Sequence, residues 1–159
     1  MRRAARVMLL LAVCLAVWAG QPETPEQPLA VIERRVWEIL NQERVELGLK
    51  ALAWDDRLAA AAREHAVNMV RYRFFSHSDP IHGDLRDRLA QAKISWRRAA
   101  ENLFAARGPQ DPARAAVEGW MKSPGHRQNA LDRDLTRAGT GATRAPDGTV
   151  YVVQIYIRR

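Results

Sequence analysis

Apolar side chains recur at the spacing of an α-helix in four parts of the chain. Each part has a recognisable boundary, because aspartate caps helix N-termini and glycine or proline ends helices. Proline in the first helical position is a clear start, since it has no N–H group to leave unpaired. The four predicted helices are residues 29–47 ended by Gly48, a second capped by Asp55 or Asp56, a short third opened by Asp84, and a fourth begun at Asp111-Pro112 and ended by Pro124-Gly125.

Alternating apolar residues replace the helical spacing near the C-terminus. Residues 137–143 and 149–157 predict the arms of a β-hairpin around the turn residues 145–148, and residues 99–105 predict another strand. In the last arm Val150, Val152 and Tyr156 face one way, whereas Tyr151, Val153, Ile155 and Ile157 face the other. A strand with two apolar faces is covered on both sides. We therefore expect an α+β fold, a three-layer α-β-α sandwich with a small, mainly antiparallel sheet between helices.

The N-terminus has the pattern of an export signal. Three arginines within residues 1–6 precede the apolar run Val7–Val17, and Val17 and Ala19 stand at the −3 and −1 positions of a cleavage site. The run is short for a membrane-spanning helix, so an uncleaved anchor is the less favoured alternative. We predict a signal peptide over residues 1–19, a linker over residues 20–29 and one domain over residues 30–159, secreted or periplasmic.

Composition narrows the classes of protein further. Cys14, the single cysteine, lies in the predicted signal, so the exported domain is expected to have no disulfide. The formal charge is +7, but the arginines are scattered and no nucleic-acid motif is present. We expect a monomer that binds no nucleic acid and has no stable membrane span once the signal is cleaved. Weak attraction to anionic envelope surfaces is a secondary possibility.

Histidines and one carboxylate are the residues most suited to chemistry. His65 lies on the apolar stripe of the second helix and is interpreted as a core histidine, and His82 lies in a loop without an obvious partner. His77 and His126 follow the ends of helices, where loops place functional groups. Glu101 interrupts an apolar run, so its charge requires a partner.

Several ordered blocks of sequence resemble the CAP superfamily, which comprises cysteine-rich secretory proteins, insect antigen 5 and plant pathogenesis-related proteins. The resemblance extends from about Val31 to Ile157. The residues of the matching blocks are most similar to those of the bacterial secreted members, which commonly lack disulfides. The matching blocks are Asn41 and Arg44 with Leu47-Gly48-Leu49, Leu52-Ala53-Trp54-Asp55, Phe75-Ser76-His77, Ala100-Glu101-Asn102-Leu103, residues 120–129 and Tyr151-Val152-Val153-Gln154.

The resemblance implies a shallow cleft lined by two histidines and two acidic residues, with a divalent metal bound by the histidines in some members. His77, Glu101 and His126 match three of these four positions, and Ser123 occupies the position of the second acid. The implied metal ligands are therefore His77 and His126, with zinc as the expected ion. The missing carboxylate weakens any mechanism that requires two acids.

Three functions fit these residues. The preferred one is a non-catalytic, extracytoplasmic binding module that takes a divalent metal, a small lipid-like ligand or an envelope-surface component. The alternative is a hydrolase in which a metal-bound water or Ser123 is the nucleophile, although two histidines fall short of the usual three protein ligands of catalytic zinc. The third is a buried polar network that only stabilises the fold. We assign no catalytic residue.

Overall fold

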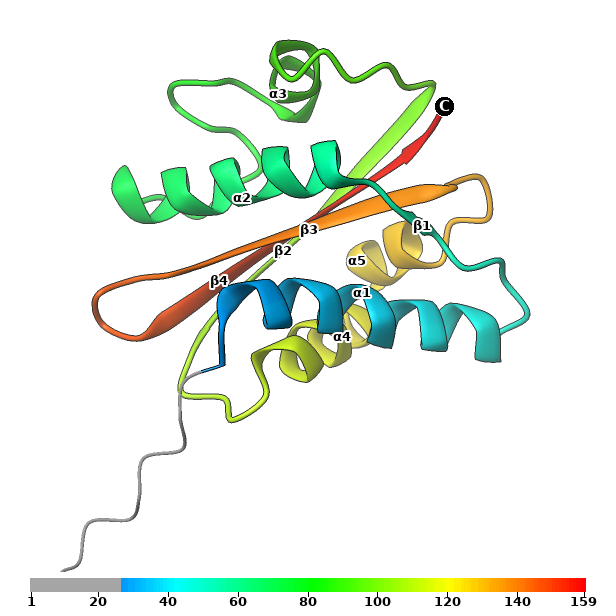
Figure 1. Cartoon of the computed structure of the whole chain (residues 1–159), viewed down its shortest axis with the longest axis horizontal. Helices are drawn as coiled ribbons and strands as arrows, with labels where there is room; N and C mark the ends of the chain where they lie inside the picture. Colours follow the sequence, from blue (N-terminus) through cyan, green and yellow to red (C-terminus); the bar gives the residue numbers. More distant parts are fainter. Residues whose placement is uncertain (1–26) are drawn as a thin grey trace, which may run out of the picture.

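A computed structural model describes residues 27–159, so the predicted signal peptide and most of the predicted linker lie outside the described residues. The helices and strands alternate irregularly along the chain (Figure 1). Their bounds are α1 Leu29–Glu46, β1 Ala53–Trp54, α2 Asp56–Arg71, α3 Leu85–Gln91, β2 Arg98–Arg107, α4 Pro112–Lys122, α5 Pro124–Ala130, β3 Arg137–Arg144 and β4 Thr149–Arg158. Within this part of the chain, no helix is both long and apolar enough to cross a membrane.

The strands form one sheet with the order β1-β3-β4-β2. β4 pairs antiparallel with both β3 and β2, and the two-residue β1 pairs parallel with β3. Helices α1, α4 and α5 cover one face of the sheet, and α2 and α3 cover the other (Figure 1). The expected three-layer sandwich with a mainly antiparallel sheet is confirmed.

β4 contributes to a hydrophobic core on each face of the sheet. Val150, Val152 and Tyr156 are buried with Trp120 of α4 in one core. Val153, Ile155 and Ile157 are buried in the other core, which also receives Leu58 of α2 and Leu89 of α3, and Tyr151 packs against it. The prediction that this strand is covered on both sides is therefore confirmed side chain by side chain.

The predicted aspartate caps are present at three helices. The Asp55 carboxylate accepts hydrogen bonds from the first backbone N–H groups of α2, and Asp111 accepts one from Arg114 N of α4. Asp84 forms a reciprocal capping box with Asp87 at α3. These side chains satisfy N–H groups that the first turn of a helix leaves unpaired.

The segment after α4 differs from the expectation. Pro124-Gly125 does follow the end of α4, but the same residues begin α5, and Ser123 is at once the C-cap of α4 and the N-cap of α5. Proline suits the first position of a helix as well as the position after one, so the sequence signal was ambiguous. His126 consequently lies in a helix and not in a loop. β1 was not predicted, because two residues are too few to show alternation.

Two glycines of β3 let α2 lie directly on the sheet. A Cβ atom at Gly139 would overlap the backbone at Leu58 and Ala59, and one at Gly141 would overlap the backbone at Ala62 and Arg63. Residue numbers increase in the same direction along α2 and along β3 at these two contacts. α2 therefore runs along β3 toward the β3–β4 hairpin.

Candidate functional site

Glu101 is the buried centre of the predicted cleft. It projects from the middle of β2, and its side chain is only 2% exposed. Arg88 of α3, also buried, donates Nη1–H to Oε2 at 2.8 Å and Nη2–H to Oε1 at 3.0 Å. His77 Nδ1 lies 2.9 Å from Oε1. The carboxylate thus has the partners that its burial requires.

These partners decide the charge of Glu101. Burial alone would raise the pKa of this carboxyl group, but the hydrogen bonds from His77 and Arg88, together with the positive charge of Arg88, outweigh burial and lower the pKa. Arg88 Nη2 also donates to the backbone carbonyl of His77 at 2.9 Å. One guanidinium therefore holds both the carboxylate and the loop that carries His77.

His77 is held at one ring nitrogen and open at the other. An ionised carboxylate only accepts hydrogen bonds, so Nδ1 of His77 carries a proton, and in the corresponding neutral tautomer the lone pair lies on Nε2. The side chain is 57% exposed, and no hydrogen bond within residues 27–159 engages Nε2. Glu101 therefore orients an accessible imidazole nitrogen.

His126, the second histidine predicted for the cleft, is paired with serine and not with an acid. His126 Nδ1 lies 3.0 Å from Ser123 Oγ, at the start of α5. Partial burial lowers the pKa of His126, and the nearby His77 lowers it further. The ring of His126 is therefore neutral at neutral pH.

Asparagine side chains fix α5 beside β2. Asn102 Nδ2 donates to the carbonyl of His126 at 2.9 Å, and Asn129 Nδ2 donates to the carbonyl of Glu101 at 3.2 Å and to Asn102 Oδ1 at 3.0 Å. Tyr156 OH lies 3.1 Å from Asn102 Nδ2. These bonds place His126 and Glu101 in one neighbourhood although 25 positions separate them in the sequence.

The depression at the predicted cleft is shallow, and most of the residues that line it are of polar or charged types. A depression of about 320 Å³ opens beside His77 and Glu101, and the side chains lining it include one aliphatic residue. The lining residues are His77, Asp84, Leu85, Arg86, Glu101 and Asn129. Such a surface offers hydrogen bonds and charges to a small polar ligand more than an apolar wall to a lipid chain.

Arg88 and Asn129 are parts of this site that the sequence did not identify. Arg88 lies next to the core residue Leu89 on a seven-residue helix, and a buried arginine in that position signals a carboxylate partner. Asn129 belongs to α5, which was not predicted. The cleft residues themselves form two pairs, His77 with Glu101 and Ser123 with His126.

The remaining histidines lie outside the cleft. His65 is completely buried and its Nε2–H donates to the carbonyl of Ser76 at 3.0 Å, as its place on the apolar stripe suggested. His82 does have partners, contrary to expectation, because its Nδ1 lies 3.0 Å from Asn68 Nδ2 and 3.4 Å from Asp79 Oδ2. The loop folds back on α2 and brings them together.

Metal binding would rest on two imidazoles. Among residues 27–159, no group of three or more His, Cys, Asp or Glu side chains is arranged to hold a metal ion. Glu101 is committed to Arg88, so His77 and His126 are the nitrogen donors that the cleft offers. Zinc accepts such donors, and water or a bound ligand would have to complete its coordination.

The chain is similar to known proteins along most of its length. The sequence pattern of the cysteine-rich secretory protein family (CAP) matches residues 37–156. The uncharacterized membrane protein YlbC of Bacillus subtilis is 36% identical over 129 residues, which are 80% of this chain and 34% of YlbC.

Solved structures show the same architecture. An extracellular protein of Bacillus anthracis that contains an SCP domain is 32% identical, with a TM-score of 0.74 over 88% of this chain and 45% of that protein. An outer surface protein of Borrelia burgdorferi shares the fold at 20% identity, with a TM-score of 0.75 over 84% of this chain and 96% of the Borrelia protein. The chain thus spans less than half the length of YlbC and of the B. anthracis protein.

Proposed function

Because the chain belongs to the cysteine-rich secretory protein (CAP) family, we propose that it is an extracytoplasmic binding protein whose cleft is formed by His77, Glu101 and His126. The extracellular B. anthracis relative and the export pattern of residues 1–19 support a place of action outside the cytoplasm. The cleft acts by holding a ligand and not by turning over a substrate.

The observation that carries this proposal is that the two histidines have different partners: His77 contacts Glu101, and His126 contacts Ser123. Nucleophilic hydrolysis by serine uses one relay in which an acid orients the histidine that activates the hydroxyl. Here the buried acid orients His77, whereas the serine contacts His126. Glu101 is furthermore neutralised by Arg88. The arrangement leaves Ser123 outside an acid–histidine relay, and of the two histidines His77 lines the depression.

The ligand class follows from what the cleft exposes. His77 Nε2 is held in place by Glu101, and His126 is neutral at neutral pH, so both offer lone pairs to a divalent metal such as zinc. The polar lining of the depression suits a small polar or anionic molecule bound with that metal. A lipid-like or envelope-surface ligand has less support, since Leu85 is the aliphatic residue of the lining.

Calorimetric titration of the purified protein with zinc tests the proposal. We expect saturable binding by the wild type, loss of that binding in the His77→Ala/His126→Ala double variant, and unchanged binding in His82→Asn, which alters a histidine outside the cleft. Equal heats from all three proteins would contradict metal binding at this cleft. A lower melting temperature of the double variant, with no zinc binding by the wild type, would instead assign His77 and His126 a structural role.

The hydrolase alternative depends on the 3.0 Å contact between Ser123 Oγ and His126 Nδ1. Ser123 is also the N-cap of α5 and His126 its third residue, so the contact has a structural explanation in capping. If the cleft is hydrolytic, a peptide or ester substrate is consumed by the wild type and not by Ser123→Ala. Substrate loss that is unaffected by Ser123→Ala and His126→Ala would exclude this mechanism.

A further inference from the structure

Exposed aromatic and basic side chains gather at the end of the molecule where the β3–β4 hairpin turns. α2 runs along β3 toward this hairpin, so the residues after α2 reach the same end (Figure 1). The Phe75 ring lies 6.2 Å from the ring of Tyr151 at the start of β4. Arg107, the last residue of β2, is paired with Thr149. We call this set the basic end: Arg71, Tyr72, Arg73, Phe75 and Arg107.

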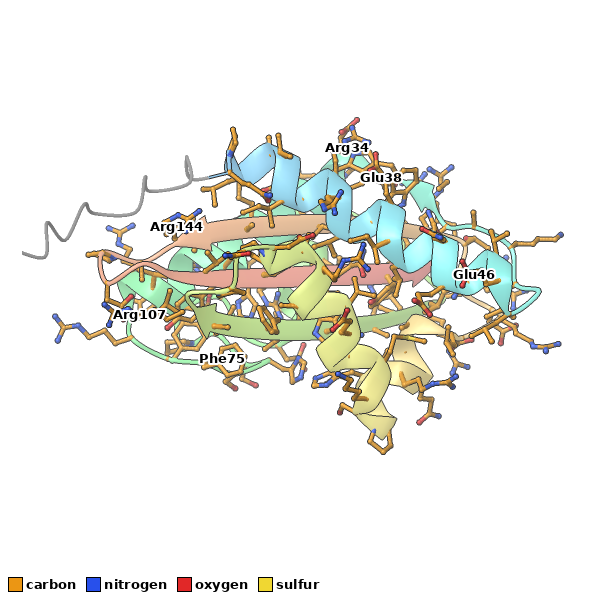
Figure 2. All side chains as sticks on the ribbon, turned by 90° about the horizontal axis from the view of Figure 1, so that it is seen from below. Arg34, Glu38, Glu46, Phe75, Arg107 and Arg144 are labelled. Carbon is orange, nitrogen blue, oxygen red and sulfur yellow. The ribbon has the colours of Figure 1, made fainter. Side chains whose placement is uncertain are left out.

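These side chains are directed to solvent. Phe75 is 54% exposed and Tyr72 is 38% exposed, which places both among the large apolar or aromatic residues that the fold leaves uncovered. Arg71, Arg73 and Arg107 are exposed as well, and the Arg71 guanidinium lies 5.4 Å from the centre of the Tyr72 ring. Figure 2 shows Phe75 and Arg107 toward the end of the sheet where Arg144 also projects.

The arginines of the basic end differ in pairing from those at the other end. At the far end of the sheet, Arg98 pairs with Asp132 at 2.6 Å, Arg158 with Asp134 at 3.4 Å and Arg159 with Asp55 at 3.1 Å. Within residues 27–159, Arg71, Arg73 and Arg107 form no ion pair with a carboxylate. Asp147 in the hairpin turn interacts with Arg107 electrostatically, without an ion-pair contact. The basic end therefore carries positive charge that its neighbours do not neutralise.

Arg73 occupies a backbone position that favours glycine. Its φ is 56°, and it follows the C-cap Tyr72 of α2. Phe74 N–H donates to the carbonyl of Met69 at 3.0 Å, which is the hydrogen bond of a Schellman ending. A residue with a Cβ atom is strained in this left-handed conformation. The position thus exposes a cation at a conformational cost that glycine would avoid.

We propose that the basic end docks on the surface of a bilayer that contains anionic lipids. Arginines without carboxylate partners are attracted to anionic headgroups, and tyrosine and phenylalanine side chains favour the interfacial region. Gln27, the first described residue, lines a depression of about 560 Å³ together with Arg107 and Arg144, so the described part of the chain begins at this end.

A bilayer suits the basic end better than a folded partner does. The side chains come from the end of α2, the α2–α3 loop and the end of β2, and of these residues only Arg107 lines the depression of about 560 Å³. A fluid surface of headgroups accommodates such scattered cations, because the attraction is additive and does not depend on one geometry. The proposal is independent of the ligand of the His77 cleft.

Co-sedimentation of the full chain with vesicles tests docking. We expect stronger binding to equal parts phosphatidylcholine and phosphatidylglycerol than to phosphatidylcholine alone, and a preference that falls as salt is added. Arg73→Gly should weaken binding to the anionic vesicles about fivefold, the effect of removing one basic residue near the surface. Arg107→Gln, on a different element, should weaken it by a similar factor.

Lys93→Gly is the matched control. Lys93 follows α3 with a φ of 53°, in the same kind of helix ending, but it lies outside the basic end. Both glycine substitutions suit their backbone, so neither is expected to unfold the protein. The N-terminal segment is common to all forms, so the difference between the two glycine variants isolates the basic end.

Two outcomes would overturn the proposal. One is an equal loss of vesicle binding in Lys93→Gly and Arg73→Gly, because the effect would then follow total charge and not position. The other is equal wild-type binding to the two kinds of vesicle combined with tight binding to a soluble polyanion such as heparin, which would indicate a different class of partner.

Discussion

A carboxylate withdrawn from water, as Glu101 is, keeps its charge only where its partners replace the lost hydration. Arg88 provides the positive charge that compensates for this lost hydration, and its own side chain is 5% exposed. Removal of Arg88 therefore leaves a buried carboxylate with only the His77 hydrogen bond, and removal of Glu101 leaves a buried guanidinium without a carboxylate. The cleft and the stability of the fold depend on the same two residues.

Arg88→Met is expected to lower the free energy of unfolding by about 3–5 kcal/mol, the range for breaking a buried ion pair from one side. Arg86→Met, at an exposed arginine two positions earlier on α3, should change it far less, because surface substitutions have small effects on stability. Urea denaturation at neutral pH measures both. Similar values for the two variants would show that Arg88 does not compensate Glu101.

Asp79 predicts how stability depends on pH. Burial acts to raise the pKa of Asp79, but hydrogen bonds from the backbone of Ile81 and His82 and from the Asn68 side chain outweigh it and lower the pKa from 3.8 to about 2. A carboxyl group with a depressed folded-state pKa stabilises the protein above its unfolded pKa, and this contribution is lost as the pH falls through the folded value.

We therefore expect wild-type stability to fall by about 2 kcal/mol between pH 4 and pH 2 through Asp79 alone. Asp79→Asn should remove that part of the pH dependence, because the amide keeps an acceptor oxygen but does not titrate. Denaturation curves over this pH range compare the two proteins. Parallel losses of stability in both would exclude Asp79 as the source.

At the residue scale, the sequence predicted the side chains of the candidate site more accurately than it predicted their hydrogen-bond partners. His77, Glu101 and His126 were identified because a histidine near an element end or an acid in an apolar run is conspicuous. Arg88 was not, since arginine is common throughout this chain and its burial depends on how α3 packs against β2. Contacts between segments that are distant in the sequence are determined by the tertiary structure.

At the scale of elements, the contact between α2 and β3 tolerates little change. Gly141→Ala would drive a Cβ atom into the backbone at Ala62 and Arg63, so we expect a loss of at least about 3 kcal/mol, typical of severe overpacking. Gly119→Ala provides the control. A Cβ atom at Gly119, inside α4, meets no atom closer than the Phe104 ring at 3.9 Å.

Gly119→Ala should stabilise the protein by about 1 kcal/mol, because alanine favours the helix more than glycine does. Thermal denaturation followed by circular dichroism distinguishes the two substitutions by the sign of the change in melting temperature. If Gly141→Ala raised the melting temperature, β3 and α2 would have to be farther apart than the structure places them.

Elements with strong caps were predicted from the sequence, and short elements were not. Asp84 and Asp111 each predicted the start of a helix, and the start of α2 was predicted at Asp55 or Asp56, of which Asp55 is the cap. α5 has seven residues and begins with Pro124-Gly125, so local signals favoured an end over a start. β1 is recognisable only by its pairing with β3. Both α5 and β1 therefore depend on contacts with the sheet, which the local sequence does not reveal.

At the scale of the whole molecule, one sheet joins two hydrophobic cores. Val117 belongs to the core beneath α1 and α4, and Leu89 belongs to the core beneath α2 and α3. Because β4 is buried in both, the cores are not expected to unfold separately. This coupling was predictable from the two apolar faces of residues 149–157.

Val117→Ala and Leu89→Ala should each shift one common unfolding transition, by about 1–3 and about 2–5 kcal/mol respectively. Tryptophan fluorescence and far-ultraviolet circular dichroism should give coincident curves for the wild type and both variants. Separate transitions in either variant would show that the two cores are independent.

The central place of β4 also bears on how the domain responds to a pulling force. β4 is the last strand, it is hydrogen-bonded to β2 on one side and β3 on the other, and it ends at the far end of the sheet from Gln27 (Figure 1). Tension applied between Gln27 and Arg159 would slide β4 lengthwise against two ladders at once. All the bonds of both ladders would share that load, whereas peeling a strand from an edge breaks them one by one. The fold is thus arranged to resist tension applied between Gln27 and Arg159.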